Sequence, residues 1–336
     1  MKIKVTTRHE GSLKDLTPNQ IHELEMHSFI NVLNVINLQL QILADEEPAR
    51  SQLEGAITRT KELSGKAIEG QQEVFFPENI QQYQKEIRTC ITSLKSAAKD
   101  DTDYLETLQK AADLFEEIFT VMDLRSDELY QRFTHPGRWL FYPVEQFKTE
   151  FNAFLYTIEK NSRGRFRILR NIALQEESDY LLNFEVDSEL DGQIGMPLLF
   201  KDVVRDLISN ARKYTPPGGH IYIGLYQRKD RLRFMVKDTG IGIPSEELHR
   251  VLEHGYRASN AEHIRTMGGG FGLTKALYVV RQLKGEMWIE SETGQDVKTE
   301  QESTAGQGTT AGQGTTTGRG TTITIDIPLP DDILDS

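Results

Sequence analysis

Apolar residues between Pro18 and about Phe133 recur every three or four positions, which is the spacing of amphipathic helices. The first segment carries two neighbouring apolar stripes. One stripe runs through Ile21, Leu24, Ser28, Asn31, Val35, Leu38 and Ile42, and the other through Phe29, Leu33, Ile36, Leu40 and Leu43. Thr17 is a suitable N-cap, and Pro18 suits the first helical position. We predict four helices, over residues 18–45, 48–73, 79–99 and 102–133, which pack as an antiparallel bundle.

After Pro143 the pattern becomes mixed. We predict helices over 144–160, 198–214 and 273–283, and strands over 166–174, 180–186, 221–226, 232–237, 288–291 and 322–327. This order predicts an α/β sandwich in which helices cover one sheet. The chain is therefore expected to be an α+β protein of two domains, namely a helical bundle over 17–135 and a mixed domain over 143–330, with tails at 1–16 and 331–336.

The composition narrows the classes of function. The length of 336 residues suits about two domains, and the formal net charge of −12 argues against general nucleic-acid binding. The single cysteine, Cys90, excludes a disulfide framework or a cysteine-rich metal site. No apolar run is long enough to span a membrane, and the polar N-terminus does not resemble a signal peptide, so a cytoplasmic location is expected.

A low-complexity stretch covers residues 294–320. Three tandem hexapeptides, each ending in Gly-Thr-Thr, occur at 305–310, 311–316 and 317–322, the last running two residues past the end of this stretch. Such a polar, glycine-rich sequence has little to bury, so we predict a flexible loop without a regulatory role.

Three motifs occur in a fixed order within the mixed domain, at 206–215 on a predicted helix, at 238–243 after a predicted strand, and at 268–273 before a predicted helix. Taken singly, each has a simpler explanation, such as a tight turn, a loop or a bonded helix residue. Three in series, each on a suitable element, are much more specific. Neither a P-loop nor a dinucleotide-binding fingerprint is present.

Each motif contributes a different chemistry. The Asp238 carboxylate, at a strand end, can accept a hydrogen bond from an amine such as adenine N6. Gly240 and Gly242 let the backbone approach a flat ring, and the glycines from 268 to 272 place helical N–H groups toward phosphates. Asn210 offers an oxygen to Mg²⁺, and Lys213 lies on nearly the same helix face and can meet phosphate charge.

The region from about 143 to 330 resembles the Bergerat-type ATPase fold shared by histidine kinases, type II topoisomerases, mismatch-repair ATPases and a class of heat-shock chaperones. Asn210–Thr215, Asp238–Pro244 and Gly268–Leu273 resemble the N, G1 and G2 boxes of histidine kinases, and Gly320–Leu329 resembles their closing G3 strand. The resemblance implies Asn210 on Mg²⁺, with a lid over ATP at 244–270. The ATP-binding residues that it implies are Asp206, Asn210, Lys213, Tyr214, Asp238, Gly240, Gly242, Ile243, Tyr256, Arg257, Gly268, Gly270, Phe271, Gly272, Leu273, Thr321 and Thr322.

This sequence departs from the family pattern at two places in the domain. Leu252 stands where histidine kinases usually carry a lid phenylalanine, and only Tyr256-Arg257 match that part of the lid. Asp206 occupies the first polar position of the N box, where many kinases have Asn or Glu. An acid there can bind Mg²⁺ or a water, which leaves room for ATP hydrolysis.

The predicted phosphoacceptor is His27 on the first helix. His27, Asn31 and Leu33 resemble the H box of the family, in which the imidazole attacks the γ-phosphate. His22 is the competing candidate, but no Asn or Leu follows it at matching offsets. Ser28 replaces the usual neighbouring acid, and Glu23, one turn earlier, is a substitute general base. Asn31 sits where the family positions a water for dephosphorylating the partner regulator.

The sequence thus predicts a sensor histidine kinase core that binds ATP and Mg²⁺, phosphorylates itself on His27 and passes the phosphoryl group to a response-regulator receiver domain. An ATP-binding pseudokinase or scaffold and an ATPase of the chaperone-like kind are the alternatives. A homodimer through the first helical hairpin is favoured over a monomer with a one-chain bundle, which the distantly related mitochondrial dehydrogenase kinases exemplify.

Overall fold

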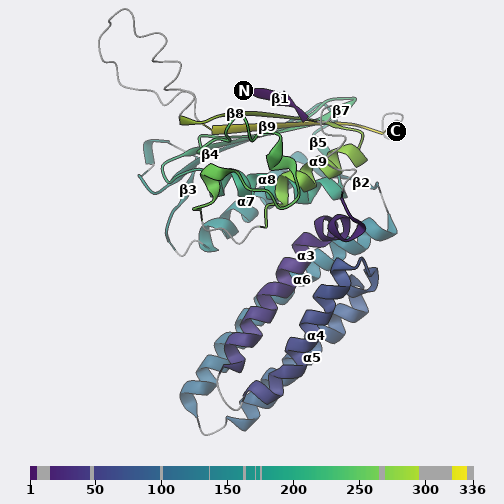
Figure 1. Ribbon diagram of the computed structural model, residues 1–336, viewed down its shortest axis with the longest axis vertical. Coiled ribbons are helices and arrows are strands. Elements are labelled where there is room, and N and C mark those ends of the chain that lie inside the picture. Colours follow the sequence, from purple (N-terminus) through teal and green to yellow (C-terminus); the bar gives the residue numbers. More distant parts are fainter. Residues whose placement is uncertain are drawn as a thin grey trace, which may run out of the picture. The chain divides into compact units, whose positions relative to one another are not determined.

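The computed structural model describes residues 1–5, 16–45, 49–98, 101–135, 137–161, 164–170, 172–174, 176–264, 269–294 and 320–330. These residues form two units (Figure 1). The helical unit spans Leu16–Arg138, and the sheet-containing unit combines the N-terminal residues with Trp139–Ser336. The two-domain α+β architecture predicted from the sequence is confirmed, although the first unit interrupts the chain of the second.

Four long helices make up the helical unit: α3 (Pro18–Ala44), α4 (Ala49–Ile68), α5 (Pro77–Ala97) and α6 (Thr102–Thr134). Thr17 caps α3 as the sequence predicts, and it forms a capping box with Gln20, because Thr17 Oγ1 accepts from Gln20 N at 3.3 Å and Thr17 N donates to Gln20 Oε1 at 2.9 Å. All four helices contribute side chains to one apolar core, which is therefore closed within a single chain.

Two details of the helical prediction are wrong. The second helix ends at Ile68 rather than near residue 73, because Gly70 adopts a φ of 78° and a short 3₁₀ helix, η1 (Gln72–Phe75), follows. The two stripes of the first helix also differ in burial. Phe29, Leu33 and Ile36 are buried, whereas Leu38 and Ile42 are 49% and 53% exposed.

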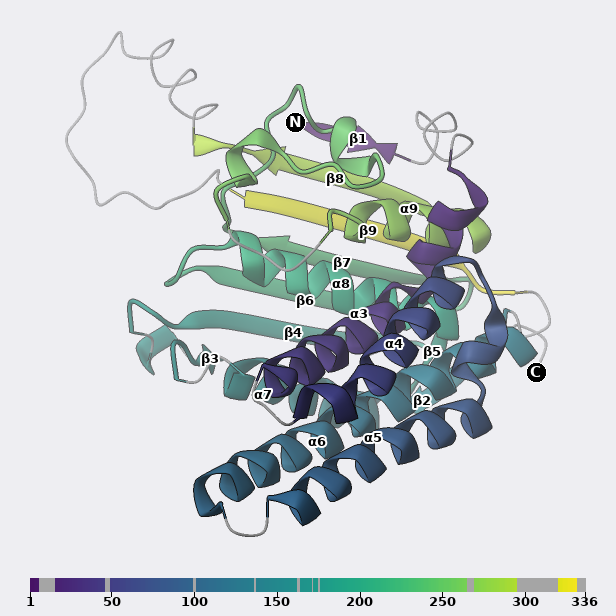
Figure 2. The ribbon, with the colours of Figure 1, turned by 60° about the horizontal axis from the view of Figure 1, so that its bottom comes forward.

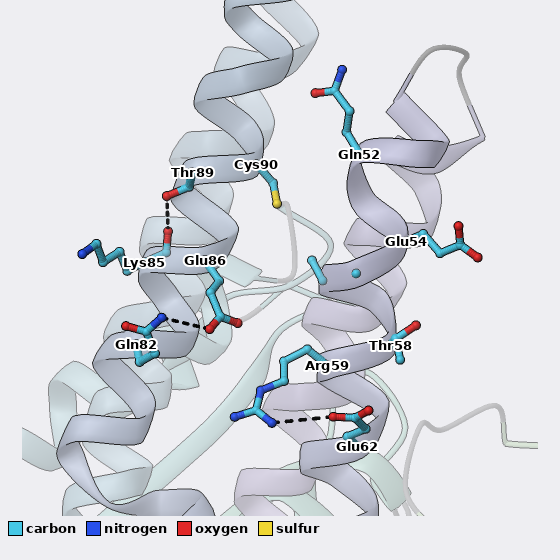
Figure 3. Close-up of a pocket in the computed structure, with 12 residues that line it drawn as sticks. Gln52, Glu54, Thr58, Arg59, Glu62, Gln82, Lys85, Glu86, Thr89 and Cys90 are labelled. Carbon is cyan, nitrogen blue, oxygen red and sulfur yellow. Dashed lines mark hydrogen bonds and ion pairs between the residues drawn. The ribbon is translucent and has the colours of Figure 1, made fainter.

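A groove of about 810 Å³ runs between α4 and α5 (Figure 3). Charged side chains line it, including the Arg59–Glu62 ion pair of α4. Cys90, on α5, is half-buried at the same groove, and burial raises the pKa of its thiol. None of the residues predicted to bind ATP or to accept a phosphoryl group lines this groove.

The second unit is built on a seven-stranded sheet with the order β1-β8-β9-β7-β6-β4-β3. The strands are β1 (Lys2–Lys4), β3 (Ile168–Leu169), β4 (Tyr180–Ser188), β6 (His220–Gln227), β7 (Arg231–Asp238), β8 (Glu286–Glu292) and β9 (Gly320–Pro328). The β3–β4 and β4–β6 pairs are parallel and the other pairs are antiparallel. Inward residues alternate with outward ones along β7, as expected for a sheet with one buried face.

Helices α7 (Val144–Asn161), α8 (Leu198–Tyr214) and α9 (Gly272–Gln282) lie along one face of this sheet (Figure 2). Their apolar sides and the inward strand residues form the core of the unit. A two-stranded sheet of β2 (Trp139–Pro143) and β5 (Gln193–Pro197) adds a second pairing that the sequence did not predict. Short 3₁₀ helices at Ile172–Leu174, Arg250–Leu252 and Ser259–Ala261 are labelled η2, η3 and η4.

Two further predictions are wrong. Residues 1–16 were expected to be a tail, but β1 pairs with β8, and Ile3 and Val5 are buried in the core of the sheet unit. The strand expected over 166–174 is only two residues long, with η2 behind it. The hexapeptide loop and the C-terminal tail lie almost wholly outside the described residues. Among the helices that the structure does describe, none combines the length and apolar character needed to cross a membrane.

Candidate functional site

Asp238, at the end of β7, joins two of the predicted motifs. Its Oδ1 accepts hydrogen bonds from Gly240 N at 2.8 Å and from Thr321 N at 3.2 Å. The side chain is buried, and burial raises the pKa of Asp238 to about 6 even though both amides favour the ionised form. The G1 loop and the start of β9 therefore meet at the Asp238 carboxylate. Burial makes the ionised form of this carboxylate unfavourable.

Gly240 packs tightly against the protein beside this carboxylate. A Cβ on Gly240 would lie 2.5 Å from Tyr214 O and 2.6 Å from Asp238 Oδ1. The same loop is bonded to the end of α8, because Ile241 N donates to Tyr214 O at 3.0 Å. A buried carboxylate at the end of a strand fits an adenine ring, since its oxygen can accept a hydrogen bond from the N6 amino group.

Gly242 provides a test of how tightly this loop is built. Its φ is 70°, and a Cβ there would lie 2.1 Å from the carbonyl oxygen of Glu292 at the end of β8. We expect Gly242→Ala to lower the free energy of unfolding by more than about 2 kcal/mol and to abolish nucleotide binding, because left-handed strain and a backbone clash add together.

Gly192→Ala is the matched control for this variant. Gly192 has a similar φ of 75°, but nothing lies within 4 Å of the added Cβ. The free energy of unfolding of Gly192→Ala should fall by only about 1–2 kcal/mol, the cost of backbone strain. This variant should still bind nucleotide. Denaturant unfolding and nucleotide titration of both variants measure the difference. Equal losses of stability and of nucleotide affinity in the two variants would show that the contact with Glu292 is unimportant.

Ser291, on β8, is a site residue that the sequence analysis missed. Its Oγ accepts from Ile243 N at 2.8 Å, donates to Gly320 O at 3.0 Å and lies 2.9 Å from Thr321 Oγ1. Asn260, in the lid, likewise donates from Nδ2 to Gly242 O at 2.9 Å. Ser291 thus ties the G1 loop to the G3 strand. A buried serine at an inward strand position is the sequence signal that could have revealed it.

Helices α8 and α9 bring the N and G2 motifs together. A Cβ on Gly272 would lie 2.8 Å from Nδ2 of Asn210, so the two residues are in direct contact. Asp206 precedes Asn210 by one turn of α8, and its Oδ2 lies 3.2 Å from Nζ of Lys275 on α9. Burial lowers the pKa of the half-buried Lys213, an effect that the charge of Asp206 opposes. Binding of an anion would compensate that desolvated ammonium.

The donors near Asn210 suit a magnesium ion that is bound mainly by a nucleotide. Within the described residues, no three His, Cys, Asp or Glu side chains cluster closely enough to hold a metal by themselves. Mg²⁺ commonly takes one or two protein oxygens and completes its coordination with phosphates and waters. Asn210 and Asp206 supply that number of oxygens on one helix face.

The described part of the predicted lid packs against itself and against α9. Arg257 Nη2 donates to Ile264 O at 2.8 Å, and the Arg250 guanidinium lies 4.4 Å from the centroid of the Tyr256 ring. Leu252 is fully buried, and its carbonyl accepts from Thr274 Oγ1 at 3.0 Å. Tyr256 and Arg257 therefore contact the lid itself, and their predicted contact with ATP stays a prediction.

The remaining predicted residues of the G2 and G3 motifs pack against the lid, the core and the sheet. Gly270, with a φ of 80°, packs on Gly255, since a Cβ there would lie 2.8 Å from the Gly255 carbonyl carbon. The Phe271 ring centroid lies 4.6 Å from that of His254. Leu273 packs against the core from the first turn of α9, and Thr322 pairs with Lys237 and Glu290 within the sheet. Gly268 lies outside the described residues.

In the helical unit, His27 is bonded to the predicted Asn31. The amide nitrogen of Asn31 lies 3.1 Å from Nε2 of His27 and donates to it when that ring nitrogen is unprotonated. The competing His22 is packed against the Gly70 backbone, where a Cβ would lie 2.3 Å from its ring, and its Nδ1 is buried. Glu23, the predicted base, lies one turn before His27 on α3 and is half-buried.

Residues 195–331 match the family described as histidine kinase-, DNA gyrase B-, and HSP90-like ATPase. Similar proteins include the adaptive-response sensory kinase SasA of Thermosynechococcus vestitus, 31% identical over 137 residues, which are 38% of this chain and 36% of that protein. SasA of a Nostoc species is 38% identical over 96 residues, 28% of this chain and 23% of the relative. Sensor histidine kinase WalK of Bacillus subtilis is 37% identical over 95 residues, 28% of this chain and 16% of the relative. The chain thus spans little more than a third, or less, of the curated relatives it matches.

Proposed function

We propose that this chain, whose residues 195–331 are a histidine kinase-, DNA gyrase B-, and HSP90-like ATPase domain, is the cytoplasmic kinase core of a two-component sensor histidine kinase. The observation that carries the proposal is the assembly of the three nucleotide motifs around Asp238 and Asn210, in a chain that also presents a histidine on a bundle helix. The activity would be transfer of the γ-phosphoryl group of ATP to that histidine.

The nucleotide would be held at both ends by this chain. Asp238 would accept from the adenine amino group, and the G1 loop that Asp238 bonds through Gly240 N would lie beside the ring. Lys213 and the amides at the start of α9 face the phosphates. Asn210 and Asp206 would hold Mg²⁺, which, when bound, neutralises phosphate charge. Most of the rate would come from positioning and from charge neutralisation.

His27 would be the nucleophile. One nitrogen of its ring attacks the γ-phosphorus, a bond from that nitrogen to phosphorus forms, and the bond from phosphorus to the β–γ bridging oxygen breaks to release ADP. Asn31, at 3.1 Å from Nε2, fixes the plane of the ring. Glu23 would accept the imidazole proton, since Ser28 is a poor base. The phosphoryl group would then pass to an aspartate of a response-regulator receiver domain, and Asn31 would support the reverse dephosphorylation.

Incubation of the chain with ATP labelled at the γ-phosphate tests the proposal. A histidine kinase gives protein-bound label that is labile in acid and stable in base. Release of free phosphate without labelled protein would instead indicate an ATPase of the chaperone-like kind. Nucleotide binding with neither product would indicate a scaffold. Either of these last two outcomes contradicts the proposed phosphotransfer.

We also propose that the chain forms a homodimer through the first helical hairpin, α3–α4, with α3 facing the partner. Because its own helices close the bundle core, the partner would cover the outward stripe at Leu38 and Ile42. We expect Leu38→Glu combined with Ile42→Glu to convert a dimer to a monomer in sedimentation velocity, since two charges cannot be buried unpaired at the interface.

The control variant for this measurement is Tyr156→Glu, which changes a 66% exposed residue of the other unit. It should leave the sedimentation coefficient unchanged. If the chain without substitutions sediments as a monomer at micromolar concentration, the dimer proposal is wrong and the one-chain bundle is the functional form.

A further inference from the structure

A lysine lies inside the core of the nucleotide-binding unit. Lys275, in the first turn of α9, is only 1% exposed and is flanked by the buried Thr274 and Ala276. An ammonium group is expensive to bury unless charged partners compensate it. Two carboxylates do so, because Lys275 Nζ lies 3.2 Å from Asp202 Oδ2 and 3.2 Å from Asp206 Oδ2.

The partners of Lys275 belong to the helix face that carries Asn210. Asp202, Asp206 and Asn210 are spaced by four residues, so they lie along one side of α8. Facing them, α9 places Lys275 opposite the first two and Gly272 against Asn210. The buried ion pairs therefore continue the contact between the N and G2 motifs into the core.

Asp202 and Asp206 do not have equivalent positions. Asp202 is fully buried, and its Oδ1 also accepts from Arg205 Nη1 at 3.2 Å. Both of its oxygens are therefore engaged by side chains of this unit. The Asp206 side chain is 31% exposed, although its Oδ2, the atom nearest Lys275, has no solvent contact. The exposed part of this side chain, which lies one turn from Asn210, therefore does not include Oδ2.

We propose that Lys275 is a positioning residue for the metal side of the nucleotide site. It holds Oδ2 of Asp206 in the core and so presents Oδ1, preorganised, to the Mg²⁺ that accompanies ATP. The inference rests on the proposed nucleotide site and adds a residue to it. Asp202 is covered entirely, whereas the Asp206 side chain is 31% exposed one turn from Asn210, so only Asp206 combines the ion pair with access to a ligand.

Calorimetric titration of the full chain with ATP, in MgCl₂ or in EDTA, tests the assignment. Lys275→Met alone leaves Asp202 short of a partner and risks unfolding, so the informative variant combines Lys275→Met with Asp202→Asn, which removes both buried charges at nearly constant volume. We expect this variant to bind ATP about 10-fold more weakly in MgCl₂ and equally well in EDTA, as for loss of a group that orients a metal ligand.

A double-mutant cycle with Asp206→Asn completes the test. Asp206→Asn alone should reproduce the loss in MgCl₂, and adding it to the Lys275→Met, Asp202→Asn variant should cause no further loss. The assignment would be overturned if the losses of ATP affinity were additive, or if they were equal in MgCl₂ and in EDTA. It would also be overturned if no variant lost affinity for ATP. Absence of label on His27 would instead count against the kinase proposal and would leave this binding comparison intact.

Discussion

His27→Gln is expected to give no phosphorylated protein when the chain is incubated with γ-labelled ATP. Glutamine keeps the approximate size of the side chain and its hydrogen-bonding capacity on α3, but it lacks a ring nitrogen that can attack phosphorus. Because His27 belongs to the helical unit, its replacement should leave the affinity for ATP and the stability of the sheet unit unchanged. Filter-bound radioactivity and calorimetric titration measure the two properties separately.

His22→Gln is the matched control, since the two histidines lie five positions apart on the same helix. The ring of His22 is packed on Gly70, which leaves no room for a phosphoryl donor on that side. The His22→Gln variant should therefore retain full labelling. Label that persists in His27→Gln and vanishes in His22→Gln would assign the acceptor to His22 and would refute the H-box resemblance.

Asp238→Asn should weaken ATP binding about 100-fold and at the same time stabilise the nucleotide-free protein. A hydrogen bond to a charged acceptor contributes about 1.5–3 kcal/mol, and the asparagine NH₂ would also face the adenine amino group. Asparagine preserves the acceptor that receives Gly240 N and Thr321 N, so the loop should keep its conformation. Calorimetric titration gives the affinity, and thermal unfolding gives the stability.

The expected gain in stability follows from the raised pKa of Asp238. Its ordinary value of 3.8 becomes about 6 in the folded protein, which corresponds to about 3 kcal/mol of unfavourable free energy for the ionised form. Between about pH 4 and pH 6 the folded state binds the extra proton, so this side chain makes the free energy of unfolding decrease as pH rises through that range. The unfavourable contribution is complete above about pH 6, and Asp238→Asn should remove both it and the associated pH dependence.

Inosine triphosphate, which carries a carbonyl oxygen in place of the adenine amino group, is the ligand control. The variant should lose much less affinity for it than for ATP, because the new asparagine NH₂ can donate to that oxygen. A variant that binds ATP normally, or that melts at a lower temperature than the unchanged protein, would contradict the role assigned to Asp238.

The helices of both units could be predicted from the sequence because their apolar spacing is long and regular. Thr17-Pro18 predicted the exact first residue of α3. The order of strands, motifs and helices in the second unit predicted its fold class. The end of α4 was missed because only the structure shows the positive φ of Gly70. Strand β1 was missed because three residues with two lysines carry no strand pattern, and its pairing partner β8 lies about 290 positions away.

The glycine motifs of the candidate site could be recognised from local sequence, whereas its supporting side chains belong to no motif. Ser291 and Lys275 come from elements remote in sequence from the groups they contact, so only weaker signals point to them. For Lys275 a signal did exist. It is a lysine in the buried stretch from Thr274 to Leu277, and a helix with two acids four residues apart, Asp202 and Asp206, precedes it in the chain.

The pairing of β1 with β8 has a consequence for any ATP-binding fragment that starts at Trp139. Such a fragment keeps every nucleotide motif but loses the strand that covers β8, whose backbone N–H and C=O groups would then face water along an open sheet edge. The sites of Ile3 and Val5 in the core would be empty as well. A fragment chosen by motif alone would therefore be prone to edge-to-edge aggregation, and Met1–Val5 act as the native protection against it.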